Sequence, residues 1–177
     1  MAICHPLNQY LKLRFYLLTR ERFSLRVVLR MGAIVLKEVQ ARMADFTRRC
    51  KEAGLVGTHQ RMVIYRVLAQ SADHPSPELV YERVSQEIPS ISKATVYKNI
   101  HTFIEAGMLR EVSELHQTNR LDANLERHHH LICTRCKKVV DYQDEQLNNT
   151  RASELEPLGF RLFEYRVEAR GLCPACR

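Results

Sequence analysis

Two pairs of cysteines constrain this chain more than any other feature of its sequence. Cys133 and Cys136 form one CxxC motif, and Cys173 and Cys176 form another near the C-terminus. Two residues between cysteines let a tight turn point both thiolates at one tetrahedral ion about 2.3 Å away, so the pairs together predict a closed four-thiolate Zn²⁺ site. A closed site has no position for a substrate, so this zinc is expected to be structural. Redox pairs or disulfides are the alternatives, and a cytosolic setting without a thioredoxin-like pattern disfavours both.

The net charge is only weak evidence for a nucleic-acid partner. The chain has 27 Lys and Arg against 20 Asp and Glu, a formal net charge of +7. Most of the excess lies in residues 1–40, which have seven basic and two acidic residues, whereas residues 41–177 have twenty and eighteen. The proportions of hydrophobic and charged residues, 45% and 27%, are those of an ordinary globular protein and exclude disordered and collagen-like classes.

Residues 1–40 form a basic N-terminal extension for which three interpretations stay open. Its uninterrupted apolar runs are too short for a signal-peptide core or a membrane span, so we expect a cytoplasmic protein. A basic amphipathic helix lying on a membrane surface or on DNA is one interpretation. The others are an unstructured or loosely helical extension, and a start codon assigned too early, with Met31 or Met43 as the true first residue.

The chain from about residue 42 onward shows the pattern of a helix-turn-helix domain. Short helical segments follow one another, and Thr58, Ser76 and Ser92 stand where helix caps are expected. After Gly107 the sequence alternates apolar and polar residues in two short runs, which predicts a β-hairpin. Three short helices followed by a hairpin are typical of a winged-helix DNA-binding domain.

The helix that starts at Ser92 and stops at Gly107 carries the candidate DNA contacts. Val96, Ile100 and Phe103 share its apolar face, which leaves small hydroxyls, lysines and a tyrosine on the other faces. Such side chains suit phosphate contact and base reading in a major groove. The candidates are Ser92, Lys93, Thr95, Tyr97 and Lys98. A solvated helix face has a similar composition, and the hairpin that follows favours the DNA-binding interpretation.

The last part of the chain predicts a small second domain of mixed structure. Two strands joined by the first CxxC turn are followed by a helix over "DEQLNNTRASELEPLGF" and by a final strand leading into the second CxxC. The expected fold class is therefore α+β. We expect the extension over residues 1–40, a winged-helix domain over 41–121 and a metal-binding domain over 122–177.

Several spaced motifs, taken together, resemble the ferric uptake regulator family over roughly residues 42–177. They are "SKATVYKNIHTFIEAGMLREV", "NRLDAN", "HHHLICTRCKKVVD" and "GLCPAC", in this order. The resemblance implies a transcriptional repressor and not an enzyme. It also implies a homodimer, with an N-terminal winged helix that binds palindromic double-stranded DNA operators and a C-terminal dimerisation domain.

The resemblance further implies a second, regulatory metal site. The residues that match the site of the family are His74, Asp122, His128, His130 and Asp141. His128 and His130 alternate on a strand, so both rings project from the same face, and Asp141 lies on the next strand. Imidazole and carboxylate donors suit Fe²⁺ or Mn²⁺ better than they suit a structural zinc. Five ligands leave one octahedral position open for peroxide.

Asp141 makes the chain similar to the peroxide-responsive branch of the family, because iron-sensing members tend to have Glu at this position. In such a sensor bound Fe²⁺ reduces peroxide and the oxidant attacks a ligand ring, for which His74 and His128 are the expected targets. The alternatives are a repressor that responds to iron, manganese or zinc without peroxide sensing, a metalloenzyme, and a zinc-ribbon interaction module that does not bind DNA. The sequence has no HExxH pair and no nucleophile elbow, which disfavours the enzyme.

An additional metal site that is common in the family is not expected here. Arg127 stands where iron sensors often have His, and His129 stands where they often have Asp. Since His129 points to the opposite face of its strand from His128 and His130, we expect it to be a surface histidine.

Overall fold

The computed structural model describes residues 25–112, 119–148, 159 and 166–177. Backbone contacts divide the chain into two compact units. The first comprises Met1–Glu114 and Thr118–Asn124, and the second comprises Leu115–Gln117 and Leu125–Arg177. Among the described helices, none has both the length and the apolar character needed to span a bilayer. The mixed helix and sheet content confirms the predicted α+β class.

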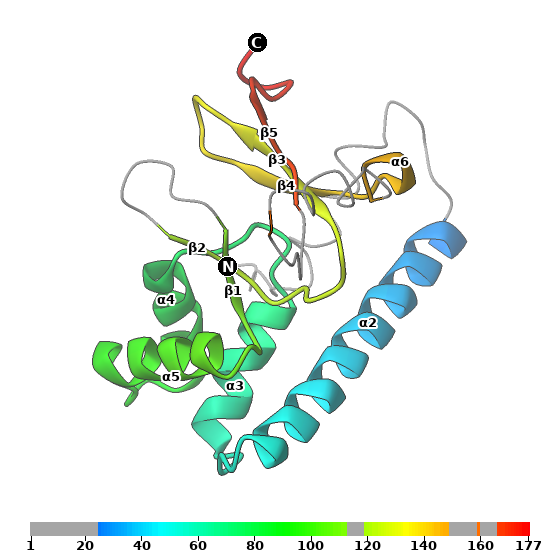
Figure 1. The fold of residues 1–177 in the computed structure, drawn as a ribbon. Helices are drawn as coiled ribbons and strands as arrows, with labels where there is room; N and C mark the ends of the chain where they lie inside the picture. The colour runs from blue at the N-terminus through cyan, green and yellow to red at the C-terminus, as the bar shows by residue number, and fades with distance from the viewer. Residues whose placement is uncertain (1–24, 113–118, 149–158, 160–165) are drawn as a thin grey trace. The chain divides into compact units, whose positions relative to one another are not determined.

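The first unit contains a run of helices followed by a two-stranded hairpin (Figure 1). The helices are α2 (Leu25–Glu52), α3 (His59–Ala69), α4 (Pro77–Glu87) and α5 (Lys93–Glu105), and the strands are β1 (Arg110–Val112) and β2 (Arg120–Asp122). Thr58, Ser76 and Ser92 cap α3, α4 and α5, because each side-chain oxygen accepts a hydrogen bond from the backbone N–H three residues later. The predicted helix starts are therefore confirmed.

Helix α2 begins at Leu25, well before residue 42, where the sequence pattern predicts the first helix. Only its last part reaches the core of the first unit, through Phe46 and Cys50, with Met43 packed against them. Val35 and Val39, one turn apart in the earlier part of α2, are buried as well, but they lie outside this core cluster. Residues 1–24 of the expected extension lie outside the described residues.

Three aromatic rings form the centre of the first unit. Phe46 of α2 stacks on Tyr65 of α3 with 4.0 Å between ring centroids. Both rings meet Phe103 of α5 edge-on, at 5.0 Å from Phe46 and 5.9 Å from Tyr65. Burial raises the pKa of Tyr65 to about 12, so its hydroxyl stays protonated at neutral pH. This cluster fixes α5 against the two other helices.

The predicted hairpin is confirmed by the pairing of β1 with β2. The strands are antiparallel, with Arg110 opposite Asp122 and Val112 opposite Arg120. Leu121 is buried, and its backbone N–H donates to the carbonyl of Pro75 at 3.0 Å. The hairpin is thereby attached to the loop between α3 and α4. The connection over residues 113–118 lies outside the described residues.

The second unit is organised around a three-stranded sheet with β3 in the middle. Strand β3 (His129–Cys133) pairs antiparallel with β4 (Val139–Tyr142) and parallel with β5 (Glu168–Gly171). These strands confirm the sequence pattern around the two CxxC motifs. Helix α6 is described over Glu145–Asn148, and most of the longer helix predicted here lies outside the described residues. The parallel pairing sets Cys133 opposite Gly171, and this register brings the two CxxC motifs together.

Replacing Phe46 with Ala is expected to lower the free energy of unfolding by about 3–5 kcal/mol, because the ring between Tyr65 and Phe103 leaves a cavity. Urea denaturation followed by circular dichroism measures this change. Leu36→Ala is the matched control, since Leu36 is 47% exposed on the same helix and should change stability by less than about 0.5 kcal/mol. Equal denaturation midpoints for the two variants would contradict the assigned core.

Candidate metal centres

The four paired cysteines converge in the second unit. Four sulfur atoms all lie within 4.8 Å of one another, those of Cys133, Cys136, Cys173 and Cys176. The sulfurs of Cys136 and Cys173 are 3.6 Å apart. Four sulfurs around a tetrahedral Zn²⁺ at about 2.3 Å would lie about 3.8 Å from one another. Both the donor type and the spacing therefore fit a closed zinc site.

Tight turns closed by backbone hydrogen bonds orient the sulfurs within each CxxC motif. Lys137 donates its backbone N–H to the carbonyl of Cys133 at 2.9 Å, and Cys176 donates to the carbonyl of Cys173 at 2.8 Å. Lys137 closes the first turn with a left-handed backbone, at a φ of 60°. The local backbone thus forms each half of the site, and the pairing of β3 with β5 joins the halves.

The thiols of this cluster ionise unequally when no cation is present. Backbone N–H groups of Cys136 and Cys173 point at the sulfur of Cys133 and lower its pKa to about 5. The hydrogen bond with the sulfur of Cys173, together with burial, raises the pKa of Cys176 to about 12. Four sulfurs this close cannot all carry charge without a counter-ion, and a bound divalent cation would stabilise all four as thiolates.

A second group of donors lies on β3 and β4 of the same unit. His128 directly precedes β3, and His130 is the register partner of Asp141. The Nε2 atoms of His128 and His130 are 3.0 Å apart. One carboxylate oxygen of Asp141 lies 3.8 Å from His128 Nε2 and 3.9 Å from His130 Nε2. The three predicted residues of this unit therefore point at a common region.

The hydrogen bond at the far side of the His128 ring determines which nitrogen can bind a metal. His128 Nδ1 lies 2.9 Å from the carbonyl oxygen of Glu126. A carbonyl can only accept, so Nδ1 donates, and the Nε2 of the neutral ring is left with its lone pair. A ring held in this way by a backbone carbonyl is typical of a metal-binding histidine. His128 and His130 are 0% and 2% exposed at the side chain, which keeps competing water away.

The first unit brings together the two other predicted ligands. His74 Nε2 lies 3.9 Å from a carboxylate oxygen of Asp122, and both side chains are 4% exposed. His74 has a left-handed backbone with a φ of 46°, in the loop between α3 and α4. The side chain of Arg120 donates to the carbonyl of His74 at 3.4 Å, so β2 holds this loop in place. Positive φ at a residue other than glycine is uncommon and concentrates at functional sites.

His129 is buried, and the prediction that it is a surface histidine was wrong. Its residue exposure is 1%, and its Nδ1 accepts a hydrogen bond from the backbone N–H of Val167 at 3.0 Å. Strand alternation gives the face on which a side chain lies, but it does not say whether that face is covered. The residue that binds His129 is 38 positions away in the sequence, so no local pattern could have indicated the contact.

The five candidate DNA-binding residues lie on or next to the first half of α5, and several are already hydrogen-bonded. Ser92 accepts a hydrogen bond from the backbone of Thr95, and the two hydroxyls lie 2.8 Å apart. Tyr97 and Lys93 both donate to the same carboxylate oxygen of Glu78 in α4, with the lysine at 3.1 Å. The hydrogen bonds from Tyr97 and Lys93 lower the pKa of Glu78, which therefore stays charged.

Sequence reasoning missed Glu78 because it belongs to a different helix. Its carboxylate lies among the candidate contacts only after α4 and α5 have packed together. An acidic residue in the first turn of a helix is common, since it interacts favourably with the helix dipole, so the position of Glu78 along the chain carries no signal of this role.

Comparison with known proteins identifies relatives that match most of the chain. The sequence profile of the ferric uptake regulator family matches residues 52–170. The peroxide-responsive repressor PerR of Staphylococcus aureus strain Mu50 is 30% identical over 145 residues, which are 82% of this chain and 98% of that protein.

Solved structures give similar matches. The peroxide stress regulator of Campylobacter jejuni is 29% identical, with a TM-score of 0.60 over 75% of this chain and 97% of its own. A zinc-bound manganese uptake regulator is 30% identical, with a TM-score of 0.58 over 72% and 97%.

Cys136→Ser and Cys173→Ser are each expected to reduce bound zinc from about one ion per chain to nearly none, because three thiolates cannot close the tetrahedral shell. Elemental analysis of the purified, dialysed protein measures the zinc content. Cys50→Ala serves as the control, since Cys50 is buried in the core of the first unit and should leave the zinc content unchanged. One zinc per chain in both serine variants would contradict the assignment.

Proposed function

The chain belongs to the ferric uptake regulator family, whose members are transcription regulators, and we propose that this member is a metal-dependent repressor that senses peroxide. The observation that carries the proposal is the set of imidazole and carboxylate donors, divided between the two units. His74 and Asp122 belong to the first unit, and His128, His130 and Asp141 belong to the second. These residues would hold Fe²⁺ or Mn²⁺, while the four cysteines would hold a structural Zn²⁺.

Neither half of the donor set fills a shell of six ligands alone. A hard divalent ion such as Fe²⁺ or Mn²⁺ prefers about six ligands, and the second unit offers three while the first offers two. One ion that uses both halves would therefore connect the units. The nature of the donors supports such an ion, because nitrogen and carboxylate oxygen ligands without thiolates suit Fe²⁺ and Mn²⁺.

The position of His74 gives such an ion influence over DNA binding. His74 lies in the loop that joins α3 to α4, and α4 in turn packs against α5. Holding the ring of His74 would restrict the orientation of the first unit. Members of the family bind DNA as dimers, and in a dimer this orientation sets the distance between the two copies of α5. That distance has to match successive major-groove faces, roughly 34–36 Å apart or a related multiple.

Coupling between metal and DNA has to act in both directions. If the metal favours the orientation that fits the operator, DNA raises the affinity for the metal by the same factor. Couplings of this kind are typically about 1–3 kcal/mol, or roughly 5- to 150-fold in affinity. A repressor needs only this difference in DNA affinity between its metal-bound and metal-free forms. Its metal site therefore does not have to turn over a substrate.

Peroxide sensing is the more specific part of the proposal, and two observations support it. Asp141 takes the place of the Glu that iron-sensing members tend to have, and two of the most similar relatives are peroxide regulators. A bound Fe²⁺ would supply the electron that cleaves the O–O bond of peroxide. The imidazole rings of His74 and His128 are the expected targets of the oxidant, and an oxidised ring would bind the metal less well. Loss of the metal would then release the DNA.

A manganese-, iron- or zinc-responsive repressor without peroxide sensing is the second candidate. It is favoured by the zinc-bound manganese uptake regulator, which has the same 30% identity to this chain as the peroxide-responsive repressor. DNA-binding titrations with Mn²⁺ and with Fe²⁺, each before and after peroxide, separate the two candidates. A peroxide sensor loses DNA binding only when iron is present.

His74→Ala and Asp122→Ala are each expected to abolish the increase in DNA affinity that Mn²⁺ causes, a loss of roughly 5- to 150-fold, while the zinc content stays at the wild-type value. Affinity is measured by fluorescence anisotropy on a duplex selected from a random library by the wild-type protein with Mn²⁺. Glu111→Ala, on the exposed face of the same hairpin as Asp122, is the control and should respond to Mn²⁺ normally. Normal Mn²⁺-dependent binding by either site variant would refute the link between the units.

For peroxide sensing, the zinc-loaded protein with Fe²⁺ is expected to gain one oxygen atom on His74 or His128 after treatment with peroxide. Peptide mass spectrometry identifies the modified residue, and the anisotropy assay reports the parallel loss of DNA binding. Protein loaded with Mn²⁺ is the control and should remain unmodified, since Mn²⁺ does not readily reduce peroxide. Unmodified peptides together with intact DNA binding would leave metal sensing as the function.

A further inference from the structure

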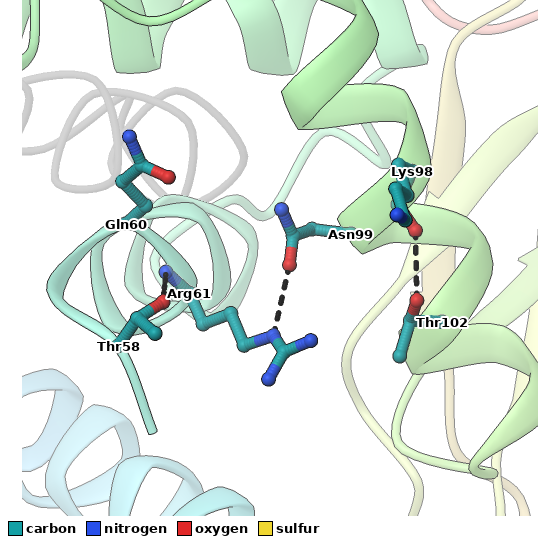
Figure 2. Close-up of a pocket in the computed structure, with 6 residues that line it drawn as sticks. All are labelled: Thr58, Gln60, Arg61, Lys98, Asn99 and Thr102. Atoms are coloured by element: carbon teal, nitrogen blue, oxygen red, sulfur yellow. Dashed lines mark hydrogen bonds between the residues drawn. The ribbon is translucent and has the colours of Figure 1, made fainter. Parts of the chain in front are cut away.

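A hollow in the first unit, separate from both groups of metal donors, has the composition of an anion site. Its volume is about 250 Å³, and it lies between the first turn of α3 and the middle of α5 (Figure 2). Every side chain that lines it is polar or basic, and no carboxylate is among them. The lining residues are Thr58, Gln60, Arg61, Lys98, Asn99 and Thr102.

The two basic side chains of the hollow are not neutralised. Across the described part of the chain, no carboxylate lies within ion-pair distance of Arg61 or Lys98, whereas several other cations on helices of the first unit are paired. Those with a carboxylate partner are Arg48, Arg49, Arg66, Arg83 and Lys93. The hollow is therefore lined by two positive charges that no carboxylate of the described residues compensates.

Arg61 is held in position before any ligand arrives. Its Nε donates to the side-chain oxygen of Asn99 at 3.0 Å, and its Nη1 donates to the carbonyl of Val56 at 2.7 Å. Asn99 is itself fixed, because its amide donates to the carbonyl of Thr95 at 2.8 Å. Figure 2 shows the guanidinium extending from α3 toward α5. Such preorganisation reduces the side-chain entropy that binding would otherwise cost.

The donors around the hollow match the chemistry of a phosphate group. A guanidinium presents planar N–H donors and an ammonium presents a compact charge, and both bind phosphate oxygens well. The amide of Gln60 and the hydroxyl of Thr58 add neutral donors at the same edge.

We propose that this hollow binds a phosphate of the DNA backbone and thereby sets how α5 sits in the major groove. The proposal rests on the proposed function, since it takes duplex DNA as the partner. The distribution of charge on α5 supports it, because Lys93 is compensated by Glu78 while Lys98 is not. Backbone contacts fix register without reading sequence, and the hollow would have that role while other α5 side chains meet the bases.

Arg61→Gln and Lys98→Gln are expected to weaken binding by the same factor on the selected operator and on a scrambled duplex. For each DNA phosphate that the variant no longer neutralises, the slope of log affinity against log salt falls by about 0.9, or by about twice that for a dimer. The ratio of wild-type to variant affinity should therefore shrink about tenfold between roughly 50 and 200 mM KCl. Anisotropy titrations on zinc-loaded protein with Mn²⁺ measure both quantities.

Lys37→Gln is the matched control, because Lys37 is an exposed lysine on α2 away from the hollow; it should leave the salt slope unchanged. Arg61→Lys keeps the charge but loses the planar guanidinium that donates to Asn99. The salt slope should therefore be retained, with a DNA affinity between those of the wild type and Arg61→Gln. Operator duplexes with single neutral methylphosphonate linkages locate the contact. Wild-type protein should lose affinity at one linkage in each half-site, where Arg61→Gln shows no further loss.

The outcomes separate this proposal from the proposed function. Unchanged salt slopes in both glutamine variants, with wild-type DNA binding intact, would overturn the phosphate site alone. A loss confined to the operator would also overturn it, because that result indicates base reading. Wild-type protein that binds no duplex with either metal would overturn both proposals together.

Discussion

Four sulfur atoms within 4.8 Å of one another form a site for one divalent cation, and much of the second unit is arranged around that site. The cluster joins the end of β3 to the turn that follows β5, so a metal there would hold the two strands in parallel register. The same strand carries His130 and is preceded by His128, whose rings point at Asp141 on β4. The spacing of these donors therefore depends on β3, whose last residue, Cys133, belongs to the thiolate cluster.

The first unit also positions metal donors, but apolar packing holds its core together. Stacked and edge-on aromatic rings fix α2, α3 and α5 together, and no metal is needed for that core. The hairpin then connects to the loop before α4 through the N–H of Leu121, and the next residue, Asp122, lies beside His74. A packed apolar core therefore supports a loop with a strained backbone, and this loop presents one imidazole to the proposed regulatory ion.

The parts that could be predicted from sequence are those encoded over short distances. Thr58, Ser76 and Ser92 each bond to a backbone N–H three residues away, so a cap is visible in a local pattern. The cysteine pairs are equally local, and only their joining depends on the sheet. Other features depend instead on packing between distant segments: the early start of α2, the burial of His129 and the hydrogen bonds that Glu78 accepts from α5. Arg61 and Asn99 were missed for the same reason, because 38 residues separate them.

The hydrogen bonds that Glu78 accepts from Lys93 and Tyr97 would affect DNA selectivity if these two side chains contact a duplex as the sequence predicts. A duplex bound by these α5 side chains would have to replace these hydrogen bonds with its own, since Lys93 and Tyr97 cannot serve Glu78 and a base equally well. On an unsuitable sequence the carboxylate would face phosphates with its donors withdrawn, which is unfavourable for a charged group. The acidic side chain would therefore act against indiscriminate adhesion to DNA of other sequences.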